Sequence, residues 1–335
     1  MGIVLVVSIV VLGAAAAFAL FLLWLYYHPA FIVKKMRSGL VDGPDSMSYP
    51  EDYAAHHSRV HMVADLVYPS IYPDNSFDLY LPAAATPAKP CPLVLWVHGG
   101  SFVAGTKEGV VNLTTIISAA GYAVLAPNYA AAPENPYPAA IIQMQELCAH
   151  LPAVAKEYGQ IDLSRVFLAG DSAGAQIAAQ YAAIETNPDF AKEMGLSAQL
   201  AAGSLRGVLL SCGPYDLHAM SRTKDLRLRY IFSVWGRAYF GKGGVKSEAA
   251  RQIDITRFVT RQYPPAYITD GNTFSFEASA RRLTKSLQEQ GVSVQTRFFP
   301  LQAGEVPHEY LFLLARPEAQ LACRDIIGFL AEYAK

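Results

Sequence analysis

Charged side chains are few in this chain, and the two signs are balanced. Asp, Glu, Lys and Arg make up 16% of the 335 residues, with 27 basic against 28 acidic side chains and a formal net charge of -1. No run of like charges is long enough to form a surface for a polyanion. Because binding to nucleic acid depends on clustered basic residues, we expect no nucleic-acid partner.

Cysteine is also scarce, and its spacing excludes a disulfide-rich or zinc-finger domain. The four cysteines form no C-x-x-C pair and mostly stand in apolar stretches: Cys91, Cys148, Cys212 and Cys323. In such stretches a free cysteine behaves as a small hydrophobic residue. We expect four buried thiols, with a disulfide as the alternative.

Charge is absent altogether from Gly2 to Tyr27. These 26 residues would form a helix of roughly 39 Å, long enough to span a bilayer with some tilt. Trp24 and two tyrosines stand at one end, where an aromatic belt would lie. A cleaved signal peptide is the alternative, since residues 14–17 are four alanines, but no basic segment precedes the apolar run. We therefore predict a retained membrane anchor over residues 1–30.

The basic residues that follow the anchor bear on its orientation. Lys34, Lys35 and Arg37 come after the apolar run, whereas only the terminal amine precedes it. The positive-inside rule then predicts a single-pass protein with its catalytic body in the cytoplasm. For a lumenal body, Asn112-Leu113-Thr114 would instead be a glycosylation sequon.

The rest of the chain divides into an irregular segment and a domain of alternating strands and helices. Residues 31–75 are rich in Pro, Tyr, His and Asp without clear periodicity, so we expect a linker that contributes to a cap. Residues 76–335 contain short apolar runs separated by helical stretches. The apolar runs are residues 93–97, 123–125, 166–169, 208–211 and 266–269. This alternation predicts an α/β fold, a mostly parallel sheet covered by helices on both faces.

One segment breaks the alternation. Residues 216–258 place about forty residues between two strands, and aromatic residues are interleaved with arginines there. A connection of this length is usually functional or contains helices of its own. We predict a helical cap insertion at about 216–258, over the ends of the strands.

The strongest chemical signal is Gly170-Asp171-Ser172-Ala173-Gly174. It follows the apolar strand of residues 166–169 and precedes a helical stretch. This is the G-x-S-x-G motif in the strand-turn-helix context of a nucleophile elbow, where flanking glycines relieve crowding in a sharp turn. We predict that Ser172 is a catalytic nucleophile.

A second glycine motif, His98-Gly99-Gly100-Ser101-Phe102, ends the strand of residues 93–97. Glycines at such a point let backbone N–H groups converge on the oxygen that becomes negative in a tetrahedral intermediate. We predict an oxyanion hole formed by Gly99 and Gly100, together with the N–H of Ala173 after the nucleophile.

These blocks resemble a known family. H-G-G-S-F-x-x-G at residues 98–105, N-Y-x-x-x-P-E-x-x-x-P-A at residues 128–139 and G-D-S-A-G together are similar to the hormone-sensitive lipase group of α/β-hydrolases. The resemblance implies an α/β-hydrolase fold, ester hydrolysis without metal or cofactor, and a cap over an acyl pocket. Its membrane-tethered members, similar to arylacetamide deacetylase, share the layout of anchor plus hydrolase domain. In this group Glu134 resembles a structural residue, and we expect a buried, hydrogen-bonded carboxylate there.

The general base and its acid should follow in the order Ser, acid, His. Of the eight histidines, His308 alone lies late enough, after the apparent last strand at residues 297–300. The acid departs from the family pattern, because Phe274 stands where the family has aspartate. Glu277, three residues later, and Asp270, at a strand end, are the two candidates, and we prefer Glu277. A Ser-His dyad is the further alternative.

Together these features predict a serine carboxylic-ester hydrolase that works through a covalent acyl-enzyme. Its expected partners are a small ester with a hydrophobic acyl group and, through the anchor, a membrane. Two alternatives stay open at this point. One is a non-catalytic protein that binds a small molecule in the same pocket, and the other is an amidase or peptidase.

Overall fold

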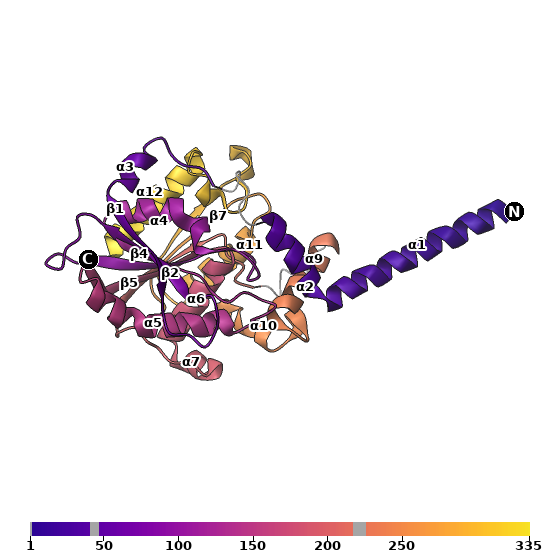
Figure 1. Cartoon of the computed structure of the whole chain (residues 1–335), viewed down its shortest axis with the longest axis horizontal. Helices are drawn as coiled ribbons and strands as arrows, with labels where there is room; N and C mark the ends of the chain where they lie inside the picture. Colours follow the sequence, from indigo (N-terminus) through magenta and orange to yellow (C-terminus); the bar gives the residue numbers. More distant parts are fainter. Residues whose placement is uncertain (1, 41–46, 217–225) are drawn as a thin grey trace.

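A single eight-stranded sheet forms the centre of the body (Figure 1). The computed structural model describes residues 2–40, 47–216 and 226–335. The strands lie in the order β1-β2-β4-β3-β5-β6-β7-β8. β2 is antiparallel to β1 and β4, and the other neighbouring pairs are parallel. Their bounds are β1 Val60–Val67, β2 Ser76–Pro82, β3 Cys91–Val97, β4 Ala123–Pro127, β5 Ile161–Asp171, β6 Leu205–Ser211, β7 Ala266–Asp270 and β8 Val294–Phe298.

Helices precede, connect and cover these strands. The longer ones are α1 Gly2–Tyr27, α2 Pro29–Leu40, α4 Val111–Ala119, α5 Ala139–Glu157, α6 Ala173–Thr186, α9 Leu226–Phe240, α11 Glu277–Glu289 and α12 Pro317–Tyr333. The shorter ones are α3 Tyr53–His57, α7 Pro188–Met194 and α10 Ala249–Gln252, with 3-10 turns at Lys107–Val110, Gly244–Lys246, Ile255–Arg257, Leu301–Ala303 and Tyr310–Phe312.

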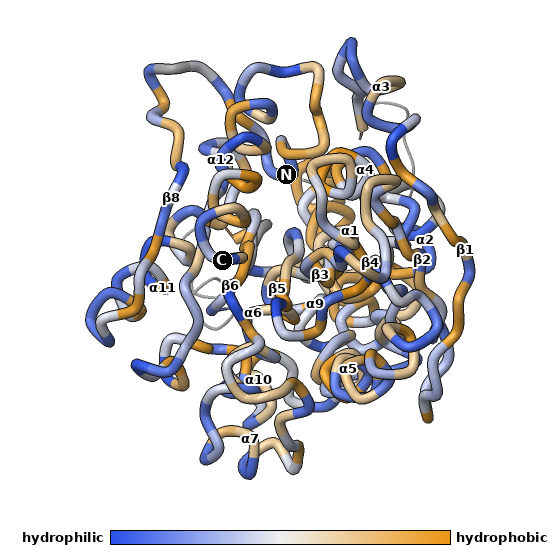
Figure 2. Tube along the Cα trace, turned by 90° about the vertical axis from the view of Figure 1, so that its left-hand side faces the viewer, coloured by the Kyte–Doolittle hydropathy of each residue, from blue (hydrophilic) through white to orange (hydrophobic). Residues whose placement is uncertain are grey.

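The central strand β3 is apolar at every position because both faces of the sheet are covered. All seven residues of β3 are buried. Leu93 and Leu95 point into one core cluster and Val94 and Trp96 into the other, as the alternation of a strand requires. α5, α6 and α11 contribute to the first cluster, and α4 and α12 to the second. The hydropathy-coloured tube is accordingly orange along β3 and β4 and bluer at the outer strand β8 (Figure 2). The prediction of an α/β-hydrolase fold is confirmed.

Residues 31–75 contain more regular structure than the predicted linker. Pro29–Leu40 forms α2, and Val33 of this helix lies 1% exposed in the main core cluster. Val60–Val67 forms β1, the edge strand, in which partly buried residues alternate irregularly with exposed ones. An edge strand faces solvent on one side and therefore carries polar residues, which in β1 include His61 and Asp65. Its sequence lacks the continuous apolar run by which the central strands were predicted.

The cap insertion predicted at about 216–258 is helical in the part that the structure describes. It comprises α9, α10 and two 3-10 turns, and residues 217–225 of the predicted segment lie outside the described residues. α9 packs against α1 and α2, so the N-terminal region and the cap form one end of the body (Figure 1).

Arg37 fastens α2 to the two loops that flank the candidate active site. Its Nε donates to the carbonyl of Val103 at 2.6 Å, and its Nη2 donates to the carbonyl of Ala132 at 2.8 Å. It also forms an ion pair with Glu134, whose carboxylate lies 2.7 Å away and is 59% exposed. The guanidinium beside it lowers the pKa of Glu134. The expectation of a buried Glu134 is therefore wrong: its partner comes from α2, on the surface.

We expect Arg37→Ala to lower the free energy of unfolding by about 1–3 kcal/mol, because it removes two charge-assisted bonds to main-chain carbonyls. Glu134→Ala should cost no more than about 1 kcal/mol, as is usual for an exposed ion pair. Urea unfolding of the two variants provides the measurement, with Lys34→Ala as an exposed control on the same helix. Equal losses for Arg37→Ala and Glu134→Ala would mean that the ion pair, rather than the carbonyl contacts, fastens α2.

Candidate active site

Ser172 lies in a strained turn between β5 and α6. Its backbone has φ 48° and ψ -118°, which is outside the regions that L-residues normally occupy. Its N–H donates to the carbonyl of Ser211 at 2.8 Å, which fastens the turn to β6. The structure thus places the hydroxyl at the carboxyl end of the central strands and at the amino end of a 14-residue helix.

The glycines of the motif are required by close packing. A Cβ on Gly174 would lie 2.0 Å from the carbonyl oxygen of Val97, and one on Gly170 would lie 2.5 Å from the carbonyl carbon of Gly174. No side chain fits at such distances, so α6 can approach β3 only with glycine at these positions.

His308 is within hydrogen-bonding distance of the nucleophile. Its Nε2 lies 3.1 Å from Oγ of Ser172, although 136 residues separate the two in sequence. Its backbone N–H donates to the carbonyl of Thr273 at 3.0 Å, and the ring of Phe276 packs edge-on against the imidazole at 4.9 Å. Burial lowers the pKa of His308 to about 4, so the imidazole is neutral near pH 7 and Nε2 can accept a proton.

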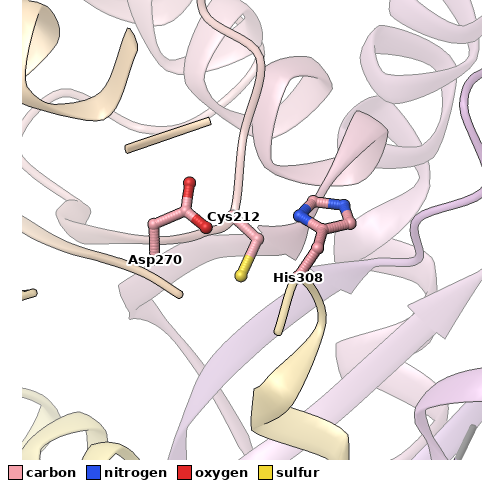
Figure 3. Close-up of side chains that lie close together, drawn as sticks. All are labelled: Cys212, Asp270 and His308. Atoms are coloured by element: carbon pink, nitrogen blue, oxygen red, sulfur yellow. The ribbon is translucent and has the colours of Figure 1, made fainter. Parts of the chain in front are cut away.

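Asp270 lies at the end of β7, and Figure 3 shows Cys212 between this residue and His308. A carboxylate oxygen of Asp270, the thiol of Cys212 and a ring nitrogen of His308 all lie within 4.8 Å of one another. Among the described residues, Oδ1 of Asp270 and Nδ1 of His308 are both buried without a hydrogen-bond partner. Oδ2 accepts from the N–H of Phe276 at 3.0 Å. Burial raises the pKa of Asp270 to about 7.

Glu277, the preferred acid from the sequence, points elsewhere. Its Oε1 accepts from Nη2 of Arg281 at 2.6 Å and from Nε at 2.7 Å, one turn along α11. An acidic side chain in the first turn is favoured by the helix dipole and by a basic residue four positions later, and both hold this carboxylate on the surface of α11. Phe274, in the family's acid position, is 87% exposed. The carboxylate of Glu277 is bound by Arg281 and does not face His308, whereas the carboxylate of the alternative candidate, Asp270, lies near the imidazole.

The glycine loop after β3 differs from the prediction in one residue. The N–H of Gly99 donates to Oδ2 of Asp171 at 2.6 Å, so it cannot face a substrate oxygen. In the described part of the chain, the N–H groups of Gly100 and Ala173 donate to no protein acceptor. A Cβ on Gly100 would lie 1.9 Å from the carbonyl oxygen of Ala104, and its φ is +123°, so glycine is required at this turn. Gly100 and Ala173 therefore remain available as donors, and Gly99 does not.

A pair of acidic side chains that the sequence did not single out, the buried Asp171 and the partly buried Glu309, lies beside the site. Asp171 accepts from the indole Nε1 of Trp96 at 2.8 Å as well as from Gly99, and the carboxyl group of Glu309 is close enough to interact with it. Burial, followed by the neighbouring Asp171 carboxylate, raises the pKa of Glu309 well above its usual range. Glu309 adopts φ 61° directly after His308, and its Oε1 lies 3.4 Å from Nε2 of that histidine. The sequence signal was an acidic residue where the family has glycine.

A narrow apolar pocket leads to Ser172. Its volume is about 30 Å³, far below the roughly 300–1,000 Å³ of typical ligand sites. Phe232, Trp235 and Tyr239 of α9 line it together with Phe276 and Phe102. The rings of Phe102 and Tyr239 stack at 4.1 Å, which joins the cap to the glycine loop. An acyl chain can enter only when these aromatic side chains move apart.

The donor atoms of Cys212, Asp270 and His308 are also close enough to ligate a metal ion. All four cysteines are free and buried, as expected from their apolar context. Because Nε2 of the same histidine faces Ser172, we assign this group to the serine site.

The sheet, the elbow and the histidine define the chain as an α/β-hydrolase. Comparisons with known proteins agree. The family model described as BD-FAE matches residues 77–276, which is more than half of the chain. The chain belongs to the BD-FAE family.

Solved structures of esterases have the same fold. Esterase B from Lactobacillus rhamnosis is 21% identical with a TM-score of 0.71, over 95% of this chain and 96% of that one. An esterase from Pyrobaculum calidifontis is 20% identical with a TM-score of 0.67, over 90% of this chain and 94% of that one. A bacterial heroin esterase is 20% identical with a TM-score of 0.64, over 91% and 90% of the two chains. The resemblance to the hormone-sensitive lipase group of α/β-hydrolases is thereby confirmed.

Proposed function

We propose that this protein is a serine carboxylic-ester hydrolase that works through a covalent acyl-enzyme. The observation that carries the proposal is the 3.1 Å contact between Oγ of Ser172, in its strained turn, and Nε2 of a neutral His308. The esterase fold supports it, and one structural neighbour is an esterase inhibited by a tributyrin phosphonate.

The first step is attack of Ser172 on the ester carbonyl carbon. Nε2 of His308 takes the hydroxyl proton as the new C–O bond forms. The carbonyl oxygen becomes negative and accepts hydrogen bonds from the N–H groups of Gly100 and Ala173. Ser101 also lines the pocket, and its N–H is a third candidate donor.

Asp270 completes the site as the acid. Its unpartnered Oδ1 and the unpartnered Nδ1 of His308 are buried in the same place, and buried polar atoms are normally paired. Catalytic hydrogen bonds are often long in the free enzyme and shorten when substrate binds. The thiol of Cys212 lies beside both groups and offsets part of the rise in the pKa of Asp270 that burial causes, which favours the charged carboxylate.

The tetrahedral intermediate then breaks down, and the proton transfer runs in the opposite direction. The imidazolium gives its proton to the leaving alkoxide, the ester C–O bond breaks, and the acyl group stays on Ser172. A water molecule then attacks the acyl carbon and gives a proton to Nε2 of His308. The bond from that carbon to Oγ breaks, Ser172 takes the proton back from His308, and the carboxylic acid leaves. The aromatic lining favours a hydrophobic acyl group over a charged one.

A fluorophosphonate probe tests this proposal directly. It should label one serine of the purified protein, and peptide mass spectrometry should place the label on Ser172. Label on another serine, or none after hours of incubation, would overturn the catalytic assignment and favour a binding protein on the same fold.

We further propose that α1 is a retained membrane anchor. It is long and apolar enough to cross a bilayer, and its central window is 0% buried against the body. Cleavage after residues 14–17 would leave a stub that still exposes Phe18, Leu20 and Leu23 by half or more of their surface. Such a stub would leave these apolar side chains in contact with water, so retention of the whole helix in a bilayer accounts better for its composition.

The orientation prediction rests on few charges. Lys34 and Lys35 are exposed on α2, just beyond the apolar helix, and Arg37 follows on the same helix. They favour a cytoplasmic body. A protease added outside intact cells should then leave the body uncut, and loss of the body under that treatment would place it on the other side.

A further inference from the structure

Helix α9 has two opposite faces with different contacts. Phe232, Trp235, Gly236 and Tyr239 line the pocket, and their i, i+3, i+4, i+7 spacing puts them on one stripe. Tyr230 and Arg237 are each two residues away from members of that stripe. Residues two apart on a helix point about 200° apart, so these two side chains lie on the opposite face.

That opposite face holds the base of α1. The hydroxyl of Tyr230 donates to the carbonyl of Leu22 at 2.7 Å. The guanidinium of Arg237 lies 5.1 Å from the ring centre of Tyr26 and 4.7 Å from that of Tyr27. α9 therefore separates the serine pocket from the end of the candidate membrane span, with one layer of helix between them.

The surface around this contact has the composition of a membrane interface. Leu226 lies four residues before Tyr230, on the same face of α9 as Tyr230 and opposite the pocket, and is 66% exposed. Tyr27 and Phe31, at the base of the anchor, are 55% and 54% exposed. Basic side chains are exposed on the same helices, at Lys34 and Arg229. Exposed apolar and aromatic groups flanked by basic ones fit the headgroup region of a bilayer.

From these contacts we infer that α9 lies on the lipid surface and that the serine pocket takes its ester from the bilayer. The inference rests on the proposed ester hydrolysis and on α1 as the anchor, and it adds the source of the substrate. α1 leaves the body at the end formed by α2, α9 and α10 (Figure 1), so a bilayer crossed by α1 meets that end. A hydrophobic ester dissolved in the outer part of the bilayer then lies next to the helix that closes the pocket.

Contact with lipid can be measured without any hydrolysis. The four native cysteines are buried, so a fluorescent thiol reagent should label a new exposed cysteine selectively. Leu226→Cys and Met62→Cys are compared, because Met62 is also exposed, at 44%, but lies on β1 away from α1. In vesicles of anionic phospholipid carrying brominated acyl chains, we expect strong quenching of the label at 226 and little at 62. Equal quenching at both positions would overturn the inference.

Substrate entry is tested with two esters and the full-length protein in the same vesicles. Leu226→Glu should slow hydrolysis of a long-chain nitrophenyl ester dissolved in the bilayer by about tenfold, the size expected when one leucine no longer partitions into lipid. Hydrolysis of water-soluble nitrophenyl acetate should stay within about twofold, since the mutation lies outside the pocket. Met62→Glu should change neither rate.

The outcomes separate this inference from the proposed function. Equal loss on both esters, or no loss on either, would contradict entry from the bilayer while leaving ester hydrolysis intact. A wild-type protein that hydrolyses neither ester would contradict the proposed function, and the quenching experiment would still decide whether α9 lies on the membrane.

Discussion

Replacing Ser172 by alanine should abolish ester hydrolysis, with a loss of kcat on the order of 10⁶-fold, as found when the nucleophile of a serine protease is removed. No other described hydroxyl is paired with Nε2 of His308, so no neighbour can take over the attack. The measurement is the initial rate of hydrolysis of a soluble nitrophenyl ester, together with loss of the fluorophosphonate label.

The variant should remain folded, because the serine hydroxyl contributes little to packing. Ser172 is 7% exposed, and the bond that fastens its turn comes from its backbone N–H, which alanine keeps. Ser101→Ala is the matched control, since Ser101 lines the same pocket without contacting His308. A Ser172→Ala variant that folds and keeps more than about a hundredth of the activity would rule out the covalent mechanism, since loss of the nucleophile costs far more.

Asp270→Asn should lower kcat by about 10⁴-fold, the cost of removing the acid from a serine triad. The carboxylate orients the neutral imidazole and stabilises the imidazolium that forms when Ser172 attacks. Asparagine has the same shape but no charge, and it still offers an oxygen to the N–H of Phe276. Glu277→Gln is the control, and we expect nearly full activity, because that carboxylate is bound by Arg281.

The same substitution should change the pH dependence. Burial raises the pKa of Asp270 to about 7, so protonation below that pH removes the charge that His308 needs. The wild-type kcat/KM should therefore fall as pH decreases through about 7. In Asp270→Asn the residual activity should fall only near pH 4, the pKa of His308. An unchanged midpoint, or an equal loss in Glu277→Gln, would contradict Asp270 as the acid.

Asp270→Asn should raise the free energy of unfolding at neutral and alkaline pH, although it lowers activity. A carboxyl whose pKa rises from 3.8 to about 7 on folding costs up to about 4 kcal/mol once it is ionised. This cost is absent below pH 3.8, builds as pH rises to 7 and is constant above. At pH 8 the Asp270→Asn variant should therefore unfold at a higher denaturant concentration than the wild type.

The sequence predicted the fold and singled out Ser172 and His308, which the structure brings together, for identifiable reasons. The buried strands carry continuous apolar runs because both faces of the sheet are covered, and Ser172 stands in a motif whose glycines are dictated by contacts with β3. His308 followed from chain order. β1 and α2 could not be recognised, because an edge strand and a helix seated partly on the surface carry polar residues that interrupt the pattern.

For the acid and the first oxyanion donor, the geometry differs from the expectation for another reason. Each depends on the direction of one group, which residue spacing does not specify. Asp270 ends β7, and whether its carboxylate faces His308 or solvent is decided by the backbone at the strand end. Gly99 lies in the expected loop, but its N–H is taken by Asp171, a partner 72 residues away.

A single residue, His28, separates the end of α1 from the start of α2. Val33 of α2 is buried in the core, and Arg37 of α2 donates to two main-chain carbonyls. The connection between the proposed membrane span and the body is therefore short and rigid. A catalytic body on a long flexible tether would sample a hemisphere of solution around its anchor point. This body should instead keep a fixed tilt relative to the membrane plane. It should then meet esters that diffuse laterally in the bilayer, so the substrate concentration that sets its rate is the number of ester molecules per unit area of membrane.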